Sequence, residues 1–385
     1  MTSLRETIQR LFSTSSVKPL PPGMYHYQAP GSDPRNYRLH LRLEPDGRGV
    51  LIVNAATVLH LNHTAAEYAF YLVQNLPEDQ VVKNVSSRYH VSPEDARQHY
   101  RDFVERIDTL VTTTDLDPVT FLDFERQEPF SGHISAPYRL DCAITYQQRD
   151  TKDTTSSPNE RVTRELSTAE WETALDKAWT AGIPHVVFTG GEPTLRDDLP
   201  QLIAKAEANS QVTGLLSDGL WLEDPEYLET LLQTGLDHLM IIFKPENENA
   251  WPALQNALEV DLFVAVHLTL TTQNQEQFPT YLQRLADAGV PAVSISANTP
   301  ELSERLHEAR TRAAQLNLEL VWNLPVPYSA LNPVSLEIEE NEVPEGAGRA
   351  WLYVEPDGDV LPAQGVNQVL GNILRDPWEQ IWRPE

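Results

Sequence analysis

The sequence predicts an α/β protein in which a mostly parallel sheet follows a smaller module of strands and helices. Between residues 137 and 325, short β-rich runs alternate with amphipathic helical patterns, and this alternation requires parallel strands joined by helical crossovers. The 385 residues suit two or three domains, and a hydrophobic fraction of 41% suffices for ordinary globular cores. The pattern alone leaves open whether the sheet is doubly wound or curls into a partial barrel.

The composition is strongly acidic, with 56 acidic against 29 basic residues and a formal net charge of −27. Such a field repels phosphate polyanions, so we expect no nucleic-acid partner, whereas a basic peptide would be attracted. The chain shows no apolar run of the roughly 20 residues that cross a bilayer, and no signal-peptide pattern. We therefore expect a cytoplasmic protein without a membrane partner.

The first module is expected over residues 37–112, after a proline-rich lead at 1–36. Alternating apolar residues predict three strands, at 37–43, 50–54 and 57–61. Helices are predicted to begin at Asn62, at Pro77 and at Ser92-Pro93, because such residues favour the first positions of a helix. A small sheet followed by three helices is a winged-helix-like module.

The second module follows a linker at 113–136 and covers residues 137–325. Its predicted strands lie at 138–146, 186–189, 212–216, 239–243, 263–269, 292–296 and 318–322. Helical patterns stand between these runs, among them 167–181, 199–208 and 226–234. Sites on such sheets lie beyond the carboxyl ends of the strands, so the residues that follow each strand are the candidates for chemistry.

A tail at 346–385 follows an acidic linker at 326–345. Its residues 356–359, Pro-Asp-Gly-Asp, predict a hairpin turn between two short strands. The chain closes with LGNILRDPWEQIW, whose tryptophans are expected to pack on the second module.

A Gly-Gly-Glu-Pro segment follows the second predicted strand of the parallel sheet. Gly190 and Gly191 allow the backbone to approach a ligand closely, and Pro193 fixes the next turn. The carboxylate of Glu192 stands at the end of the strand, where it could accept hydrogen bonds from an ammonium group. Asp218, Lys244 and His267 also lie near predicted strand ends, and a lysine–carboxylate pair there could perform acid–base chemistry.

Cysteine usage limits the metal chemistry of the chain. Cys142 is the one cysteine, so neither an intramolecular disulfide nor a cluster held by several thiolates can form. The histidines form no HxH or HExxH pair, so no zinc site is indicated. Cys142 lies inside a predicted strand and is expected to be a small buried hydrophobic residue.

The text GIPHVVFTGGEPTLRDDLPQLI resembles the radical S-adenosylmethionine superfamily. The resemblance extends from ELSTAEWETALDKAWTAG to the tail LYVEPDGDVLPAQGVNQVLGNILRDPWEQIW, which is similar to SPASM or twitch extensions. It implies a partial (β/α)6 barrel in which the Gly190–Gly191–Glu192 segment holds the amino group of S-adenosylmethionine. The first module, with GVLIVNAATVLHLNHTAAEYAFYLV, resembles the PqqD-like family, which implies binding of a leader peptide as an added strand.

The chain departs from the superfamily where the iron–sulfur cluster would be held. The family's first strand ends in Thr-Tyr-x-Cys-x3-Cys-x2-Cys, and the three ligand positions fall here on Gln148, Lys152 and Thr155. In the tail, Ala363 stands where relatives have cysteine. Phe243 and Lys244 are expected to intrude on the cofactor position. The resemblance therefore implies a degenerate relative without a [4Fe–4S] cluster and without radical chemistry.

The leading functional hypothesis is a peptide-binding or scaffold protein that assists a genuine radical enzyme or presents a peptide to it. Two alternatives remain open. The chain could still bind S-adenosylmethionine, as a sensor or a methyl donor. It could also be a non-radical enzyme that uses Glu192, Asp218, Lys244 and His267 in the remnant pocket.

Overall fold

The computed structural model describes residues 18–30, 32–33, 35, 37–53, 57–112, 134–149, 161–247, 249–321 and 346–383. The chain divides into two compact units, residues 1–135 and 136–385, which are described separately. Lys152, Thr155 and the acidic linker at 326–345 lie outside the described residues. None of the helices in the described part is both long and apolar enough to cross a membrane.

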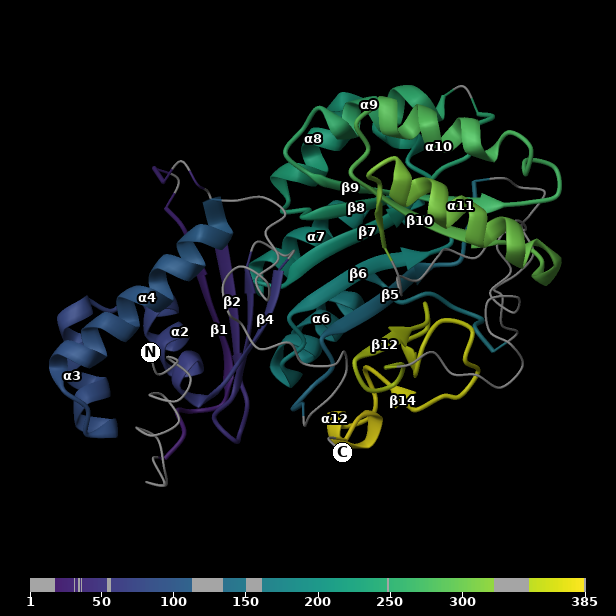
Figure 1. Ribbon diagram of the computed structural model, residues 1–385. Helices are drawn as coiled ribbons and strands as arrows, with labels where there is room; N and C mark the ends of the chain where they lie inside the picture. Colours follow the sequence, from purple (N-terminus) through teal and green to yellow (C-terminus); the bar gives the residue numbers. More distant parts are fainter. Residues whose placement is uncertain are drawn as a thin grey trace. The chain divides into compact units, whose positions relative to one another are not determined.

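The first unit contains an antiparallel sheet whose four strands pair in sequence order. The elements are β1 (Gly23–Gln28), β2 (Arg38–Leu43), β3 (Gly49–Val53), β4 (Thr57–Leu61), α2 (His63–Val73), α3 (Glu78–Tyr89) and α4 (Pro93–Thr112) (Figure 1). The three helices and the three later strands were predicted. Strand β1 was not, because its short run follows the prolines of the lead and is not strongly alternating.

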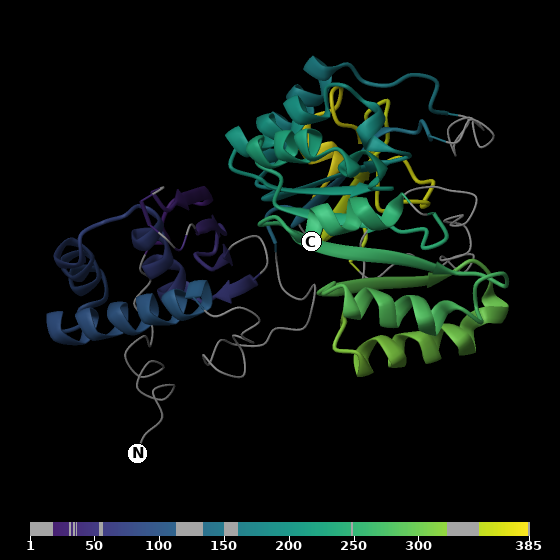
Figure 2. The ribbon, with the colours of Figure 1, turned by 90° about the horizontal axis from the view of Figure 1, so that it is seen from above.

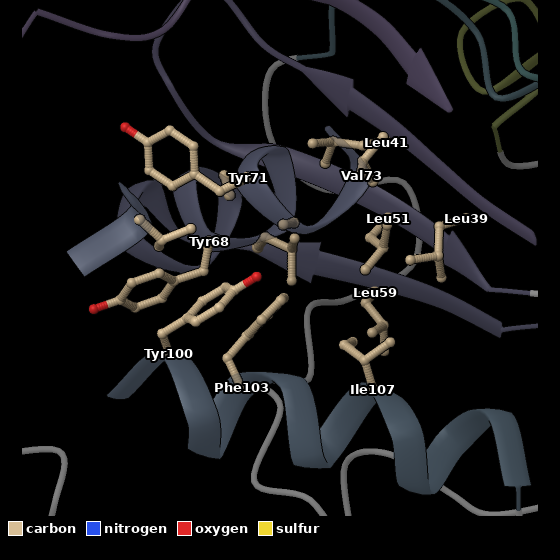
Figure 3. Packing of buried hydrophobic residues seen from close by; sticks show 14 of the residues in the cluster. Leu39, Leu41, Leu51, Leu59, Tyr68, Tyr71, Val73, Tyr100, Phe103 and Ile107 are labelled. Atoms are coloured by element: carbon tan, nitrogen blue, oxygen red, sulfur yellow. The ribbon is translucent and has the colours of Figure 1, made fainter. Parts of the chain in front are cut away.

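The helices of the first unit pack on one face of this sheet. Figure 3 shows Ile107 projecting from α4 toward Leu59 of the sheet, while the rings of Tyr100 and Phe103 lie beside Tyr68 of α2. Helix α2 begins at the predicted cap, where the backbone N–H of Ala65 donates to the side chain of Asn62 at 3.0 Å. Leu51 and Leu59 are 0% and 2% exposed, so this layer is a fully formed core.

The second unit is built on a ten-stranded sheet of order β11-β10-β9-β8-β7-β6-β5-β12-β13-β14. Its strands are β5 (Arg139–Thr145), β6 (His185–Gly190), β7 (Val212–Ser217), β8 (His238–Ile242), β9 (Phe263–Leu270), β10 (Ala292–Ala297), β11 (Glu319–Leu320), β12 (Trp351–Val354), β13 (Asp359–Leu361) and β14 (Gly371–Asn372). Its α-helices are α6 (Thr168–Ala181), α7 (Leu199–Ala208), α8 (Pro225–Gln233), α9 (Ala250–Leu258), α10 (Phe278–Asp287), α11 (Ser303–Gln315) and α12 (Trp378–Ile381). Three 3-10 turns, η2 (Pro193–Leu195), η3 (Leu220–Glu223) and η4 (Pro300–Leu302), follow strands β6, β7 and β10.

The strands of the second module follow one another in a regular order. From β5 to β11 each strand is parallel to the next along the chain and lies beside it. A doubly wound sheet reverses this order at a switch point, and the run from β5 to β11 has no reversal; β12 then joins the other side of β5. Helices α10 and α11 lie side by side next to β9 and β10 (Figures 1 and 2). The predicted α/β class with a mostly parallel sheet is confirmed.

The tail continues the same sheet. Strand β12 pairs in parallel with β5, and β13 and β14 follow in antiparallel pairing. The turn between β12 and β13 includes Gly358 at φ +90°, which a glycine adopts at little cost. The predicted hairpin at residues 356–359 is therefore confirmed.

One face of the parallel strands changes from apolar to polar along its length. Buried apolar side chains from five strands form a cluster on this face: Val187, Leu216, Met240, Ala265 and Ala292. Side chains alternate along a strand, so the residue two positions further along lies on the same face. In β6, β9 and β10 these next residues are Thr189, His267 and Ser294. The polar end of this face lies at the carboxyl ends of the strands.

Candidate functional site

The candidate site lies at the carboxyl ends of β5, β6 and β7. These strands are neighbours in the sheet, so the loops that follow them begin side by side. They supply Arg149 after β5, Glu192 after β6 and Asp218 after β7. The structure thus brings together two of the residues that the sequence indicated, Glu192 and Asp218.

The two glycines of the Gly-Gly-Glu segment make room for the chain's own backbone. Gly191 N–H donates to the carbonyl of Thr145 at 2.8 Å, and Glu192 N–H donates to the carbonyl of Gln147 at 2.7 Å. A Cβ atom at Gly190 would lie 2.1 Å from the carbonyl oxygen of Thr145, and one at Gly191 would lie 2.1 Å from that of Gln147. Their small size is therefore required by the packing of this loop against the end of β5.

Glu192 is 4% exposed, and the chain's own donors surround its carboxylate. Oε1 accepts from Thr194 N–H at 3.0 Å, Thr194 Oγ1 at 2.5 Å and Ser217 Oγ at 2.8 Å, while Oε2 accepts from Asp218 N–H at 2.6 Å. Three of these donors converge on Oε1, so Oε2, which has one donor, keeps one acceptor position. Burial and, second, the charge of Asp218 raise the pKa of Glu192 to about 7.

Asp218 forms an ion pair with Arg149. Arg149 Nε lies 2.9 Å from Asp218 Oδ2, and Nη2 lies 3.3 Å from Oδ1. Nη2 of Arg149 also donates to Thr194 Oγ1 at 3.1 Å, which joins the guanidinium to the hydroxyl that bonds Glu192. The result is one connected network of two carboxylates and one guanidinium.

Aromatic rings lie beside this network. The guanidinium carbon of Arg149 is 5.6 Å from the ring centroid of Trp221, a cation–π distance. Trp221 is 45% exposed and meets the ring of Tyr227 edge-on at 5.5 Å. The outer side of the site is therefore a guanidinium stacked against a half-exposed tryptophan.

His267 belongs to a different polar cluster. Its Nδ1 lies 3.0 Å from Ser294 Oγ, and its Nε2 lies 3.1 Å from Ser296 Oγ on the neighbouring strand β10. The side chain is 1% exposed, and burial lowers its pKa to about 3, so the imidazole is neutral at pH 7. In the described part of the chain, the hydrogen bonds of His267 reach Ser294, Ser296 and Thr269 and neither Glu192 nor Asp218.

The structure corrects the expectation for the end of β8. Phe243 does not intrude on the site, because its ring packs edge-on against Trp251 of α9 at 4.8 Å. It lies on the opposite side of the strand from Ile242, which packs on the apolar cluster of the other face. Lys244 is exposed, and among the described ion pairs its ammonium reaches neither Glu192 nor Asp218. The four candidate residues therefore do not form a single acid–base centre.

Cys142 lies in the middle of β5 and is 0% exposed. Its thiol is 3.9 Å from the carbonyl oxygen of Leu140, and burial raises its pKa far above the usual value. Gln148 lies just after β5, and Ala363 is 4% exposed after β13. No group of three or more histidine, cysteine or acidic residues in the described part of the chain could hold a metal ion.

Sequence reasoning missed Arg149, Thr194, Ser217 and Trp221. The signal for Arg149 was present: it is the first basic residue after β5, and the next two loops of the same sheet edge carry Glu192 and Asp218. Thr194 and Ser217 showed no such signal. Their role depends on the side-chain orientation of Glu192, which a sequence pattern does not specify.

The site lies within a segment that a family model recognises. Residues 142–244 match the Radical SAM superfamily. This radical SAM segment runs from the middle of β5 to Lys244 and so includes Arg149, Glu192 and Asp218. The match covers the strands that build the candidate site.

Comparison with individual proteins finds relatives in sequence and in fold. The PqqA peptide cyclase of Granulibacter bethesdensis is 26% identical over 249 residues, which are 58% of this chain and 65% of that protein. The chain therefore matches less than two thirds of the length of this curated relative. Among solved structures, Streptococcus suis SuiB bound to S-adenosylmethionine aligns with a TM-score of 0.54 at 16% identity over 93% of this chain and 88% of SuiB.

SuiB bound to its precursor peptide SuiA aligns with a TM-score of 0.55 at 15% identity and the same coverage of both chains. At such identity the similarity concerns the fold. The chain is thus related in sequence to a PqqA peptide cyclase and in fold to SuiB.

Proposed function

We propose that this chain is a peptide-binding relative of the peptide-modifying radical SAM proteins that holds no cysteine-ligated cluster and performs no radical chemistry. The observation that carries the proposal is the single cysteine, Cys142, buried inside strand β5. A [4Fe–4S] cluster of this superfamily is held by three thiolates, and such clusters supply the low-potential electron for cofactor cleavage. The residues present do not fit that group.

The Glu192 carboxylate also does not fit the amino group of S-adenosylmethionine as the resemblance implies. Four donors of the chain already bond it, three of them on Oε1, and it is 4% exposed. An added ammonium would find one open acceptor position, on Oε2, and would compete with the chain's own donors for Oε1. This favours the peptide-binding function over the alternative in which the chain retains the cofactor.

Peptide binding is proposed for the first unit. Within the described residues, β1 and β4 each pair with a single neighbour, so the sheet has two open edges. Strand β1 is six residues long and only partly buried, and such an edge presents backbone groups to an extended peptide. The names of the relatives support a peptide partner: one is a PqqA peptide cyclase, and SuiB is bound to a precursor peptide.

The test is a titration of the full chain with short peptides encoded near its gene, followed by fluorescence anisotropy. A scrambled peptide of equal composition controls for simple attraction by the net charge of −27. We expect binding of one native peptide at least about tenfold tighter than its scrambled form, with slower amide exchange along β1 or β4. Equal affinity of native and scrambled forms for every peptide, together with unchanged exchange in the first unit, would refute peptide recognition.

A further inference from the structure

The network of Glu192, Asp218 and Arg149 places two carboxylates and one guanidinium in a partly buried site. Glu192 is 4% exposed and the side chain of Asp218 is 25% exposed, so two carboxylates share one partly dehydrated site. The side chain of Glu192 reaches the backbone of Asp218, because its Oε2 accepts from the N–H of Asp218. Two carboxylates at such a distance disfavour each other's ionised form unless a cation stands nearby.

Arg149 is the cation that the chain provides. Its guanidinium forms two contacts with Asp218 and one with Thr194, whose hydroxyl proton is donated to Glu192. The side chain is 28% exposed and stacks at 5.6 Å against Trp221. A planar guanidinium can bond both oxygens of a carboxylate and lie against an aromatic face at the same time, whereas the compact ammonium of a lysine cannot.

The position of Arg149 in the chain suggests why it reaches this site. It lies in the loop after β5, and this loop is fixed by the bonds from Gly191 and Glu192 to the carbonyls of Thr145 and Gln147. The same close approach that requires the two glycines therefore delivers the guanidinium to the neighbouring carboxylates.

We propose that the Glu192–Asp218 site is able to bind a planar or ammonium-type cation, and that the guanidinium of Arg149 occupies this site as an internal ligand. The inference rests on the proposed function in one respect, namely that no external cofactor competes for this site. Removing the guanidinium leaves an anionic site open beside Trp221. A small guanidinium ion supplied in solution then takes its place.

The test is chemical rescue of Arg149→Ala in the full chain. We expect a Tm about 4 °C or more below that of the wild-type protein, because two carboxylates lose their cation. Guanidinium chloride at tens of millimolar should recover at least half of this loss, while sodium chloride at the same ionic strength should not. Refolding yield with each salt supplies the same comparison if the variant does not fold in plain buffer.

Arg305→Ala is the matched control, since Arg305 is 55% exposed and pairs with the exposed Glu308. Guanidinium should not raise the Tm of this variant or of the wild-type protein, because neither has an open anionic site. Equal effects of guanidinium and sodium chloride on Arg149→Ala, or equal rescue of both variants, would overturn the inference. Calorimetric binding of S-adenosylmethionine by the wild-type protein would instead refute the proposed function and leave the rescue comparison intact.

Discussion

At Gly191 the loop after β6 approaches the backbone of residues 146 and 147 closely. A Cβ atom there would lie 2.1 Å from the carbonyl oxygen of Gln147 and 2.8 Å from the carbonyl carbon of Tyr146. Backbone atoms cannot move aside as the end of a flexible side chain can. A glycine pair that sequence reasoning assigns to ligand approach therefore also has a purely conformational cause.

We expect Gly191→Ala to lower the free energy of unfolding by about 2–3 kcal/mol, as overpacking does. Gly289→Ala is the matched control, because its Cβ would meet nothing within 4 Å although its φ of +82° adds a strain of about 1 kcal/mol. Urea denaturation of both variants measures the difference. Equal destabilisation would show that the loop after β6 is not packed as described.

Only part of the candidate site could be predicted from the sequence. Glu192 and Asp218 were found because each follows a strand of the parallel sheet, and the edge of such a sheet gathers these loops. That Glu192 bonds Thr194 and Ser217 was not predictable, since this depends on a rotamer. The expectation for Phe243 was wrong because the first residue after β8 continues the alternation of the strand and faces α9.

Strands β9 and β10 are joined by more than their backbone ladder. His267 of β9 contacts Ser294 and Ser296 of β10 at 3.0 and 3.1 Å, and all of these contacts are largely buried. The pKa of His267 is lowered to about 3 by burial, against about 6.5 in an unfolded chain. The unfolded state therefore binds more protons between these values, and the stability from neutral His267 is lost as pH falls from about 6.5 toward 3.

We expect His267→Gln to reduce this acid sensitivity. The loss of unfolding free energy between pH 7.5 and pH 4.5 should be about 2 kcal/mol larger for the wild-type protein than for the variant. Urea denaturation at both pH values measures it, and the other histidines, His40 and His238 among them, contribute equally to both proteins and cancel. An identical loss in the two proteins would mean that His267 is not held neutral by this pair of strands.

At the scale of elements, the sequence predicted most of the second unit. Its βα alternation is strong because each strand is a short apolar run and each helix has a marked start, such as the capping box of Ser167 and Glu170. Strand β1 was missed because a partly buried edge strand shows little apolar alternation. The winding of the sheet could not be predicted either, since strand order is set by long-range pairing and not by local pattern.

The two units of the chain differ in the kind of site that each contains. Within the described residues, β1 and β4 of the first unit each pair with one neighbour, and the second unit has a strand-end site in which Arg149 pairs with Asp218. The second contains the radical SAM segment, yet its one thiol is enclosed in β5. The function proposed above therefore assigns this chain a radical SAM-like framework without a thiolate-held cluster.

Anaerobic reconstitution with iron and sulfide, followed by reduction in the presence of S-adenosylmethionine, tests this account most directly. The Cys142→Ala variant is the matched control, because iron that binds equally to both proteins is adventitious. We expect no cubane absorption or paramagnetic signal that depends on the protein's fold, and no 5′-deoxyadenosine above the level without protein. A bound cubane cluster together with 5′-deoxyadenosine release by the wild-type chain would contradict the account.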